Sequence, residues 1–193
     1  MSFNKKISET ALRVGPVRGS YAFVFSPRKN PDGTDGKYGI QLLIPKSDKQ
    51  AVDMINKAFE AAKQAGVPTK FKGKMPASLK NKTTPLRDGD DEKEGDPVYE
   101  GMWFINASSQ TKPGVRVLEN GTISEALDAD DFYSGCWCAA TVNFYPYEAS
   151  GNMGVACGLN NVIKTKDDDR LGGGNSADAD FRDMVDAAAG YLD

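Results

Sequence analysis

The pattern of residues 133–164 brings together side chains that could bind a ligand. One face of its first half is small and apolar, and consists of Cys136, Cys138, Ala140, Val142 and Phe144. The other face mixes aromatic rings with hydrogen-bonding groups, and consists of Trp137, Ala139, Thr141, Asn143, Tyr145 and Tyr147. Rings stack on flat ligands, while amides and hydroxyls bond to polar edges. Because this mixture costs free energy in a dry interior, it predicts a wet, ligand-binding face.

Strict alternation with a period of two places these residues on a β-strand. Residues 148–154 (EASGNMG) then supply Gly and Asn where a turn needs a positive φ. Residues 155–163 resume as a return strand, so the unit is predicted to be a long hairpin. The chain is organised around this hairpin.

Charge is strongly segregated along the chain, although the net charge is only −3. Residues 1–87 hold 17 basic and 6 acidic side chains, a net charge of +11, whereas residues 88–193 carry −14. The last 27 residues, 167–193, alone carry −6. This separation predicts a basic body and an acidic tail.

Residues 70–82 (KFKGKMPASLKNK) concentrate lysine within a stretch that Gly73 and Pro76 keep from forming regular structure. One interpretation is a solvated loop. The other is a mobile basic arm that closes over a polyanion and releases its condensed counterions. The charge run alone does not choose between them.

Several classes of function lack their usual residues here. The chain has no histidine, which removes the commonest general base and the usual partner of a catalytic nucleophile. It also lacks the Gly-rich phosphate loop and the HExxH, GxSxG and EF-hand patterns. The three cysteines are odd in number and lie on expected strands, so we interpret them as small buried hydrophobes. We therefore expect no enzyme, cofactor or metal site.

No apolar run approaches the ~18 residues of a transmembrane helix. The beginning of the chain, MSFNKKISET, has no apolar signal-peptide core. We therefore expect no membrane association and a cytoplasmic location.

The remaining elements surround one predicted helix. Ser47 and Gln50 fit a capping box, Val52, Ile55, Phe59 and Ala62 follow at helical spacing, and Gly66 and Pro68 end the helix. The expected strands are 21–25, 37–45, 98–107 and, shorter, 112–117. We interpret Tyr21, Phe23 and Phe25 as a core face, and strand 98–107 as central because both its faces are apolar. Residues 27–36 are a predicted turn, and 84–96 a predicted acidic surface loop.

These elements predict a mainly β fold, an OB-fold-like antiparallel β-barrel with one helix and a disordered acidic tail. The predicted division is a domain over residues 1–166 and a flexible tail over 167–193. Open barrels of this type bind single-stranded nucleic acid through rings set among Lys and Arg, without sequence preference. No base-reading helix is evident, which disfavours duplex recognition.

Five blocks resemble, in order, those of a family of tailed-phage single-stranded-DNA-binding proteins. They are KYGIQLLIPKSD (37–48), PLRDGD (85–90), YEGMWFINASS (99–109), YSGCWCAATVNFYPY (133–147) and GVACGLNNVIK (154–164). The resemblance covers most of residues 10–175. It implies an OB-fold core that binds single-stranded DNA (ssDNA) without strong sequence preference during phage replication or recombination, an acidic C-terminal tail, and a location in the cytoplasm of the infected host.

The candidate DNA contacts combine stacking, polar and ionic groups. Trp137, Tyr145 and Tyr147 are candidates for stacking, Asn143 for a polar contact, and Arg13, Arg18, Lys37, Lys70, Lys72, Lys74, Lys80, Lys82 and Arg87 for phosphate contacts. Each ring could instead belong to the core. Arg87 stands beside acidic residues and could instead hold its loop through a salt bridge.

The tail is a candidate switch between two mutually exclusive states. It would occupy the basic groove without DNA, and DNA would free it to recruit phage or host replication and recombination proteins. The candidate partner-binding residues are Asp178, Asp180, Phe181, Asp183, Asp186, Tyr191 and Asp193. The alternative is a tail that only increases solubility.

Two other classes of function remain open from the residues alone. A structural β-barrel of a virion, in the capsid decoration or the tail, explains the strands but not the basic body. A protein that mimics DNA would use the acidic half instead. Salt dependence distinguishes them, because only a DNA binder loses DNA affinity steeply as salt rises.

Overall fold

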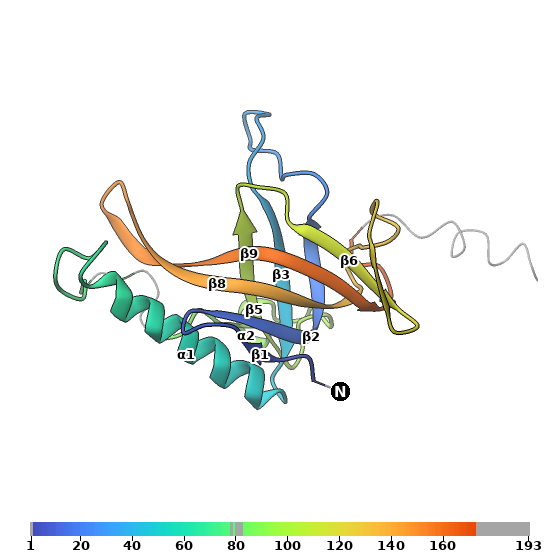
Figure 1. The fold of residues 1–193 in the computed structure, drawn as a ribbon, viewed down its shortest axis with the longest axis horizontal. Coiled ribbons are helices and arrows are strands. Elements are labelled where there is room, and N and C mark those ends of the chain that lie inside the picture. Colours follow the sequence, from blue (N-terminus) through green and yellow to red (C-terminus); the bar gives the residue numbers. More distant parts are fainter. Residues whose placement is uncertain (1, 78, 80–82, 173–193) are drawn as a thin grey trace, which may run out of the picture.

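The computed structural model describes residues 2–77, 79 and 83–172, and its elements are labelled in Figure 1. The strands are β1 (Lys5–Lys6), β2 (Ala11–Phe23), β3 (Tyr38–Pro45), β4 (Arg87–Asp88), β5 (Met102–Ser109), β6 (Gly114–Glu119), β7 (Thr122–Glu125), β8 (Trp137–Ala149) and β9 (Asn152–Lys166). The helices are α1 (Lys49–Gly66) and the four-residue α2 (Gly89–Glu92). The mainly β prediction is confirmed, with a short second helix in the predicted acidic loop.

Five strands close into a ring in the order β2–β3–β5–β9–β8 and back to β2. The closing contact between β5 and β9 is parallel, with Ser108 opposite Gly158, whereas the prediction was an antiparallel barrel. The reason is geometric, because an odd number of strands cannot alternate in direction all the way around a ring. With only this one residue pair at the closure, the ring is not a regular barrel.

The hairpin of β8 and β9 has the predicted alternation. Cys136, Cys138, Ala140, Val142 and Phe144 are buried in the core, and the opposite face of β8 is partly open to solvent. Its turn places Ser150 at φ 50° and Gly151 at φ 81°, the two positive values that a tight hairpin turn requires. The three cysteines are buried as predicted, and burial raises the pKa of the Cys157 thiol to about 12.

Helix α1 packs against the ring through its apolar stripe. Ile55, Phe59 and Ala62 are buried, and the Phe59 ring meets Phe144 of β8 edge-on at 6.2 Å between centroids. The helix begins one residue later than predicted, because the Asp48 carboxylate, rather than the Ser47 hydroxyl, accepts the hydrogen bond of the Ala51 N–H at 2.9 Å.

Strand β5 lies inside the sheet, as its two apolar faces predicted. Ile105 points to the main core, while Phe104 joins Leu43 and Tyr99 in a small cluster on the outer face. The segment 86–101 packs over this cluster, so the predicted surface loop also covers part of the sheet.

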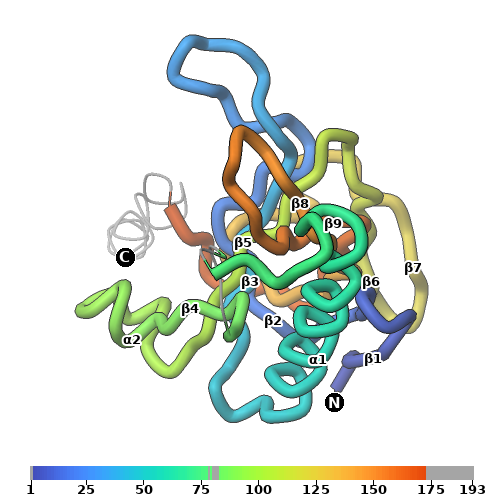
Figure 2. The backbone as a smooth tube through the Cα atoms, turned by 90° about the vertical axis from the view of Figure 1, so that its left-hand side faces the viewer, coloured from blue at the N-terminus to red at the C-terminus, as the bar shows by residue number. Residues whose placement is uncertain are grey.

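The loop between β2 and β3, residues 24–37, projects from the ring on the side opposite α1 (Figures 1 and 2). Within the loop, Lys29 and Asp35 pair as an isolated β-bridge and as an ion pair. Neither helix of the described part of the chain is long and apolar enough to span a membrane.

Candidate nucleic-acid interface

A groove of about 620 Å³ crosses the outer face of β2, β3 and β5. Its rings are Tyr21, Phe23 and Tyr38; its cations are Arg28, Lys37 and Lys93; its other polar side chains are Asn30, Gln41, Asn106 and Ser108. The rings come from two adjacent strands, and two of the cations come from the projecting loop that rises beside them. The groove therefore combines stacking surfaces with positive charge.

The exposure of Tyr21 and Phe23 corrects the prediction that they form a core face. Tyr21 is 58% exposed and Phe23 is 37% exposed, and only Phe25 packs against the core. The pairing of β2 with β3 shifts between Ser20 and Phe23, and Tyr21 has a φ of 48°. Such a bulge breaks the period of two and redirects the side chains that follow it. Alternation alone carries no signal of the bulge, so the sequence analysis missed both rings.

Two predicted side chains, Asn143 and Tyr145, extend this surface beyond the groove. Strand registers align Phe23, Gly39, Ser108, Gly158 and Asn143 in one row across five strands. A Cβ at Gly158 would lie 2.7 Å from Asn143 Oδ1 and 3.2 Å from Tyr145 Cε1. Both side chains therefore lie over this glycine, and Tyr145 is 38% exposed.

The cations of the groove differ in whether other groups of the protein contact them. Arg28 and Lys37 make no ion pair with any described residue, so both charges are available to a polyanion. The Lys93 ammonium lies 5.6 Å from the centre of the Tyr99 ring. Of these three, only Lys37 was predicted, because Arg28 stands in a turn sequence and Lys93 among acidic residues.

Two predicted phosphate contacts are engaged within the protein. Arg13 Nε donates to the Phe3 carbonyl at 2.7 Å. Arg87 pairs with Glu92 and lies 4.6 Å from the Phe104 ring centre, and the bond to Glu92 raises the pKa of the guanidinium. The structure thus shows the alternative interpretation of Arg87, a salt bridge that holds its loop.

The predicted basic arm is attached to the body through an apolar side chain. Phe71 is buried against Gly66, while Lys70, Lys72 and Lys74 are exposed around it. The loop that follows α1 lies beside the tip of the β8–β9 hairpin (Figures 1 and 2), and none of these three lysines lines the groove. Lys80 and Lys82 lie outside the described residues.

Tyr147 also lies toward the hairpin tip. A Cβ at its partner Gly154 would be 2.7 Å from the Tyr147 hydroxyl, so the ring folds over the neighbouring strand. Trp137 is ten residues earlier on β8, roughly 33 Å away at 3.3 Å per residue. The predicted rings of β8 therefore do not form one compact site.

Trp137 and Arg18 meet the first residues of the acidic segment. Trp137 Nε1 donates to Asp168 Oδ2 at 2.7 Å, and Arg18 Nη2 donates to the Asp169 carbonyl at 3.1 Å. A second cavity of about 600 Å³, which shares Tyr21 and Phe23 with the groove, extends to Leu171 and Gly172. The acidic segment thus starts at one end of the ring-lined surface.

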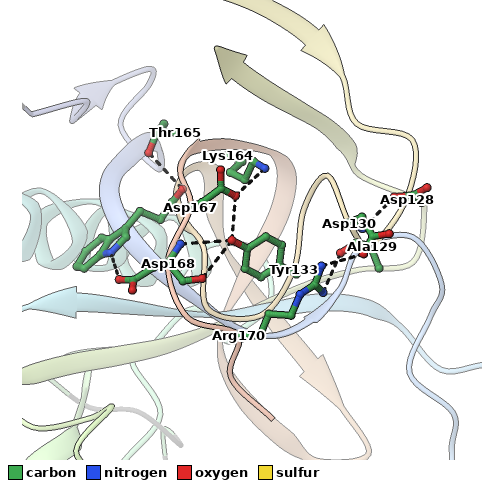
Figure 3. A network of polar contacts seen from close by, with 10 residues as sticks. Asp128, Ala129, Asp130, Tyr133, Lys164, Thr165, Asp167, Asp168 and Arg170 are labelled. Carbon is green, nitrogen blue, oxygen red and sulfur yellow. Dashed lines mark hydrogen bonds and ion pairs between the residues drawn. The ribbon is translucent and has the colours of Figure 1, made fainter. Parts of the chain in front are cut away.

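A network that we call the clasp, formed by Tyr133, Lys164, Asp167, Asp168 and Arg170, holds this segment (Figure 3). Asp167 accepts hydrogen bonds from Lys164 Nζ and the Tyr133 hydroxyl, both at 2.8 Å. The Arg170 guanidinium pairs with Asp130 at 2.8 Å and lies 4.2 Å from the Tyr133 ring centre.

The clasp favours the ionised form of its carboxylates. The hydrogen bond from Lys164 and, to a smaller extent, that from Tyr133 lower the pKa of Asp167. The Asp169 N–H and the Trp137 indole lower the pKa of Asp168. The predicted partner-binding residues, from Asp178 to Asp193, lie outside the described residues.

No group of three or more His, Cys, Asp or Glu in the described ranges is placed to hold a metal ion. The groove itself offers rings for stacking, amides for hydrogen bonding and cations for ion pairing.

Comparison with known proteins agrees with this geometry. The chain is 30% identical over 176 residues to protein p50 of Acyrthosiphon pisum secondary endosymbiont phage 1, covering 90% of this chain and 93% of that protein. The structure matches the single-stranded DNA-binding protein from bacteriophage Enc34 in complex with ssDNA, at a TM-score of 0.70 and 29% identity, covering 87% of this chain and 96% of that one.

The structure of this chain also shares its fold with gp2.5, a single-stranded DNA-binding protein encoded by bacteriophage T7. The TM-score is 0.55 and the identity 18%, over 86% of this chain and 97% of that one. These matches confirm the expected OB-fold. The family model of the Enterobacter phage Enc34 ssDNA-binding protein matches residues 10–191. With nearly its whole length matched, the chain belongs to this family of phage single-stranded-DNA-binding proteins.

Proposed function

We propose that this protein binds single-stranded DNA without strong sequence preference and protects it during phage replication or recombination in the infected cell. The observation that carries the proposal is the groove, where the exposed rings of Tyr21 and Phe23 lie beside Arg28 and Lys37, two cations without an ion pair to any described residue. Family membership supports it independently. The protein acts by binding and not by catalysis.

The groove supplies affinity in two ways. Each base stacked on a ring contributes roughly 1–3 kcal/mol, and every base has a π-face, so this contribution tolerates any sequence. Each phosphate contact releases counterions and adds a salt-dependent contribution. Single-stranded DNA is favoured over duplex, because its unpaired bases are free to stack.

Titration of a fluorescently labelled oligo-dT tests the proposal, with anisotropy measured over a series of salt concentrations. Three groove cations, at roughly −0.7 each, predict a slope of about −2 for the logarithm of the association constant against the logarithm of salt concentration. A competing duplex of the same length should displace little oligo-dT. Absence of binding at low salt would contradict the proposal and favour a virion component.

The acidic tail, in this proposal, competes with DNA and recruits partner proteins when displaced. This is supported by two contacts at the start of the segment 167–193, which carries −6: Asp168 accepts a hydrogen bond from Trp137 and lies 3.8 Å from Arg18. A tail bound to the groove excludes DNA, whereas a displaced tail is free to bind replication or recombination proteins.

Removing residues 167–193 should therefore tighten binding to oligo-dT by about fivefold or more at low salt, within the usual range of coupling between sites. The gain should shrink as salt rises, because screening weakens the competing charges. A chain ending at Gly172 is the matched control, since it keeps the clasp and lacks only residues 173–193. Comparing the two shortened chains separates the effect of the clasp from that of the segment beyond it. Unchanged affinity of both shortened chains at low salt would exclude competition by the tail.

A further inference from the structure

Two side-chain amides form a relay on the floor of the groove. The Tyr99 hydroxyl donates to Gln41 Oε1, and Gln41 Nε2 donates to Asn106 Oδ1 at 2.9 Å. Tyr99 and Gln41 are buried, at 3% and 7% exposure, whereas Asn106 is open to the groove. Gln41 and Asn106 are direct partners across β3 and β5, so the backbone holds the two amides side by side.

The relay has a direction that fixes what Asn106 presents to a ligand. A phenol has one proton to donate, and Gln41 receives it on its oxygen. Gln41 must then offer its NH₂ group to Asn106, which accepts through Oδ1. Asn106 therefore turns its own NH₂ group toward the groove, where no described residue accepts from it.

Reversal of the Asn106 amide is disfavoured by its neighbour. A flipped Asn106 would place its NH₂ group against the NH₂ group of Gln41, and the Gln41 donor, which is buried, would lose its acceptor. If Gln41 flipped in response, its NH₂ group would face the Tyr99 oxygen, and the phenol proton would need another acceptor in a buried site. The buried end of the relay thus selects the orientation of its exposed end.

The groove between the rings is where the edges of stacked bases would lie, if the protein binds DNA as proposed above. An NH₂ group that faces the groove there matches carbonyl oxygens, of which thymine has two. Adenine has no carbonyl group, and its acceptor N7 lies beside the N6 amino group. Its usual bidentate pairing with Asn therefore needs the side-chain oxygen as an acceptor for N6 as well as the NH₂ group as a donor to N7. In this protein that oxygen faces Gln41, which donates to one of its two lone pairs, so it is turned away from a base that meets the NH₂ group.

We infer that Asn106 is a specificity-determining residue, which gives an otherwise sequence-tolerant groove a modest preference for bases with carbonyl groups, thymine above adenine. Tyr99 and Gln41 are positioning residues that act through it. The preference comes from one hydrogen bond, so it changes affinity by a small factor and leaves binding to mixed sequences intact.

The test compares oligo-dT and oligo-dA of equal length by competition against a labelled oligonucleotide, using the full chain at fixed salt. Asn106→Ala should weaken binding of oligo-dT about threefold to tenfold, the range for one hydrogen bond, and that of oligo-dA less than twofold. Stacking of the bases within free oligo-dA is the same for every variant. The readout is therefore the change in the ratio of the affinity for oligo-dT to the affinity for oligo-dA.

Two further variants separate base contact from structure. Ser109→Ala removes a polar side chain of the same strand outside the groove, and should leave the ratio of the two affinities unchanged. Tyr99→Phe keeps the ring and removes the proton that orients Gln41, so it should lower the ratio while leaving the salt dependence unchanged.

An equal loss on both oligonucleotides, or no loss, in Asn106→Ala would overturn the inference. An unchanged ratio in Tyr99→Phe, beside a lowered one in Asn106→Ala, would overturn the role of Tyr99. If the unaltered protein bound neither oligonucleotide, the proposed function itself would fail, which is a different outcome from binding without preference.

Discussion

Replacing Tyr21 and Phe23 together with alanine is expected to weaken binding to oligo-dT by about thirtyfold or more. The two rings are the exposed aromatic side chains of β2 in the groove, and stacking on each contributes roughly 1–3 kcal/mol, so the lower limit for both is about 2 kcal/mol. The salt dependence should be unchanged, because no cation is removed. Anisotropy titration over a salt series measures both quantities.

Leu127→Ala is the matched control, since Leu127 is 77% exposed and lies outside the groove. Leu127→Ala should leave the affinity for oligo-dT unchanged. The double variant should also keep its melting temperature within a few degrees, because neither ring belongs to the hydrophobic core. A double variant that binds as tightly as the unaltered protein would move the site away from this groove, toward Tyr145 and the outer face of β8.

Phe59→Ala is expected to lower the free energy of unfolding by about 3–5 kcal/mol. The Phe59 ring is fully buried between α1 and β8, where it meets Phe144 edge-on. Its removal leaves a cavity that rigid strands cannot fill, because their spacing is set by backbone hydrogen bonds. For a protein with a typical stability of about 5–15 kcal/mol, this loss is large.

Urea unfolding followed by circular dichroism measures this change. Lys57→Ala, on the exposed face of the same helix, is the control and should change the free energy by less than about 0.5 kcal/mol. A loss below 1 kcal/mol in Phe59→Ala would mean that α1 contributes little to the packing of the ring. DNA binding by the folded fraction should be retained, because Phe59 lies in the core and the groove on the outer face.

Local sequence patterns were sufficient to predict features that depend on a single strand or helix. The alternation in β8 identified the apolar face, all of which is buried, because a regular strand exposes alternate side chains. Ala139, predicted on the opposite face, is buried as well. Helical spacing identified Ile55, Phe59 and Ala62 as the buried stripe of α1. The segregation of charge along the chain is likewise a property of the sequence alone.

Packing between distant segments decided the candidate site. Trp137 was predicted from its strand, but its partner Asp168 comes from the segment assigned to the tail. Arg87 lies beside several carboxylates in the sequence, and only the turn of α2 selects Glu92 as its partner. Sequence spacing does not determine such pairings, because they depend on where the chain returns in space.

The sequence by itself determined the β-hairpin, the apolar stripe of the helix, the separation of charge and, through the ordered blocks, the family. Tertiary structure alone decided which rings face solvent and which charges have no ion pair within the described part of the chain. The physical reason is the bulge in β2, which the pairing of β2 with β3 creates. It turns Tyr21 and Phe23 outward, beside cations that a separate loop supplies, and no period within one strand contains that information.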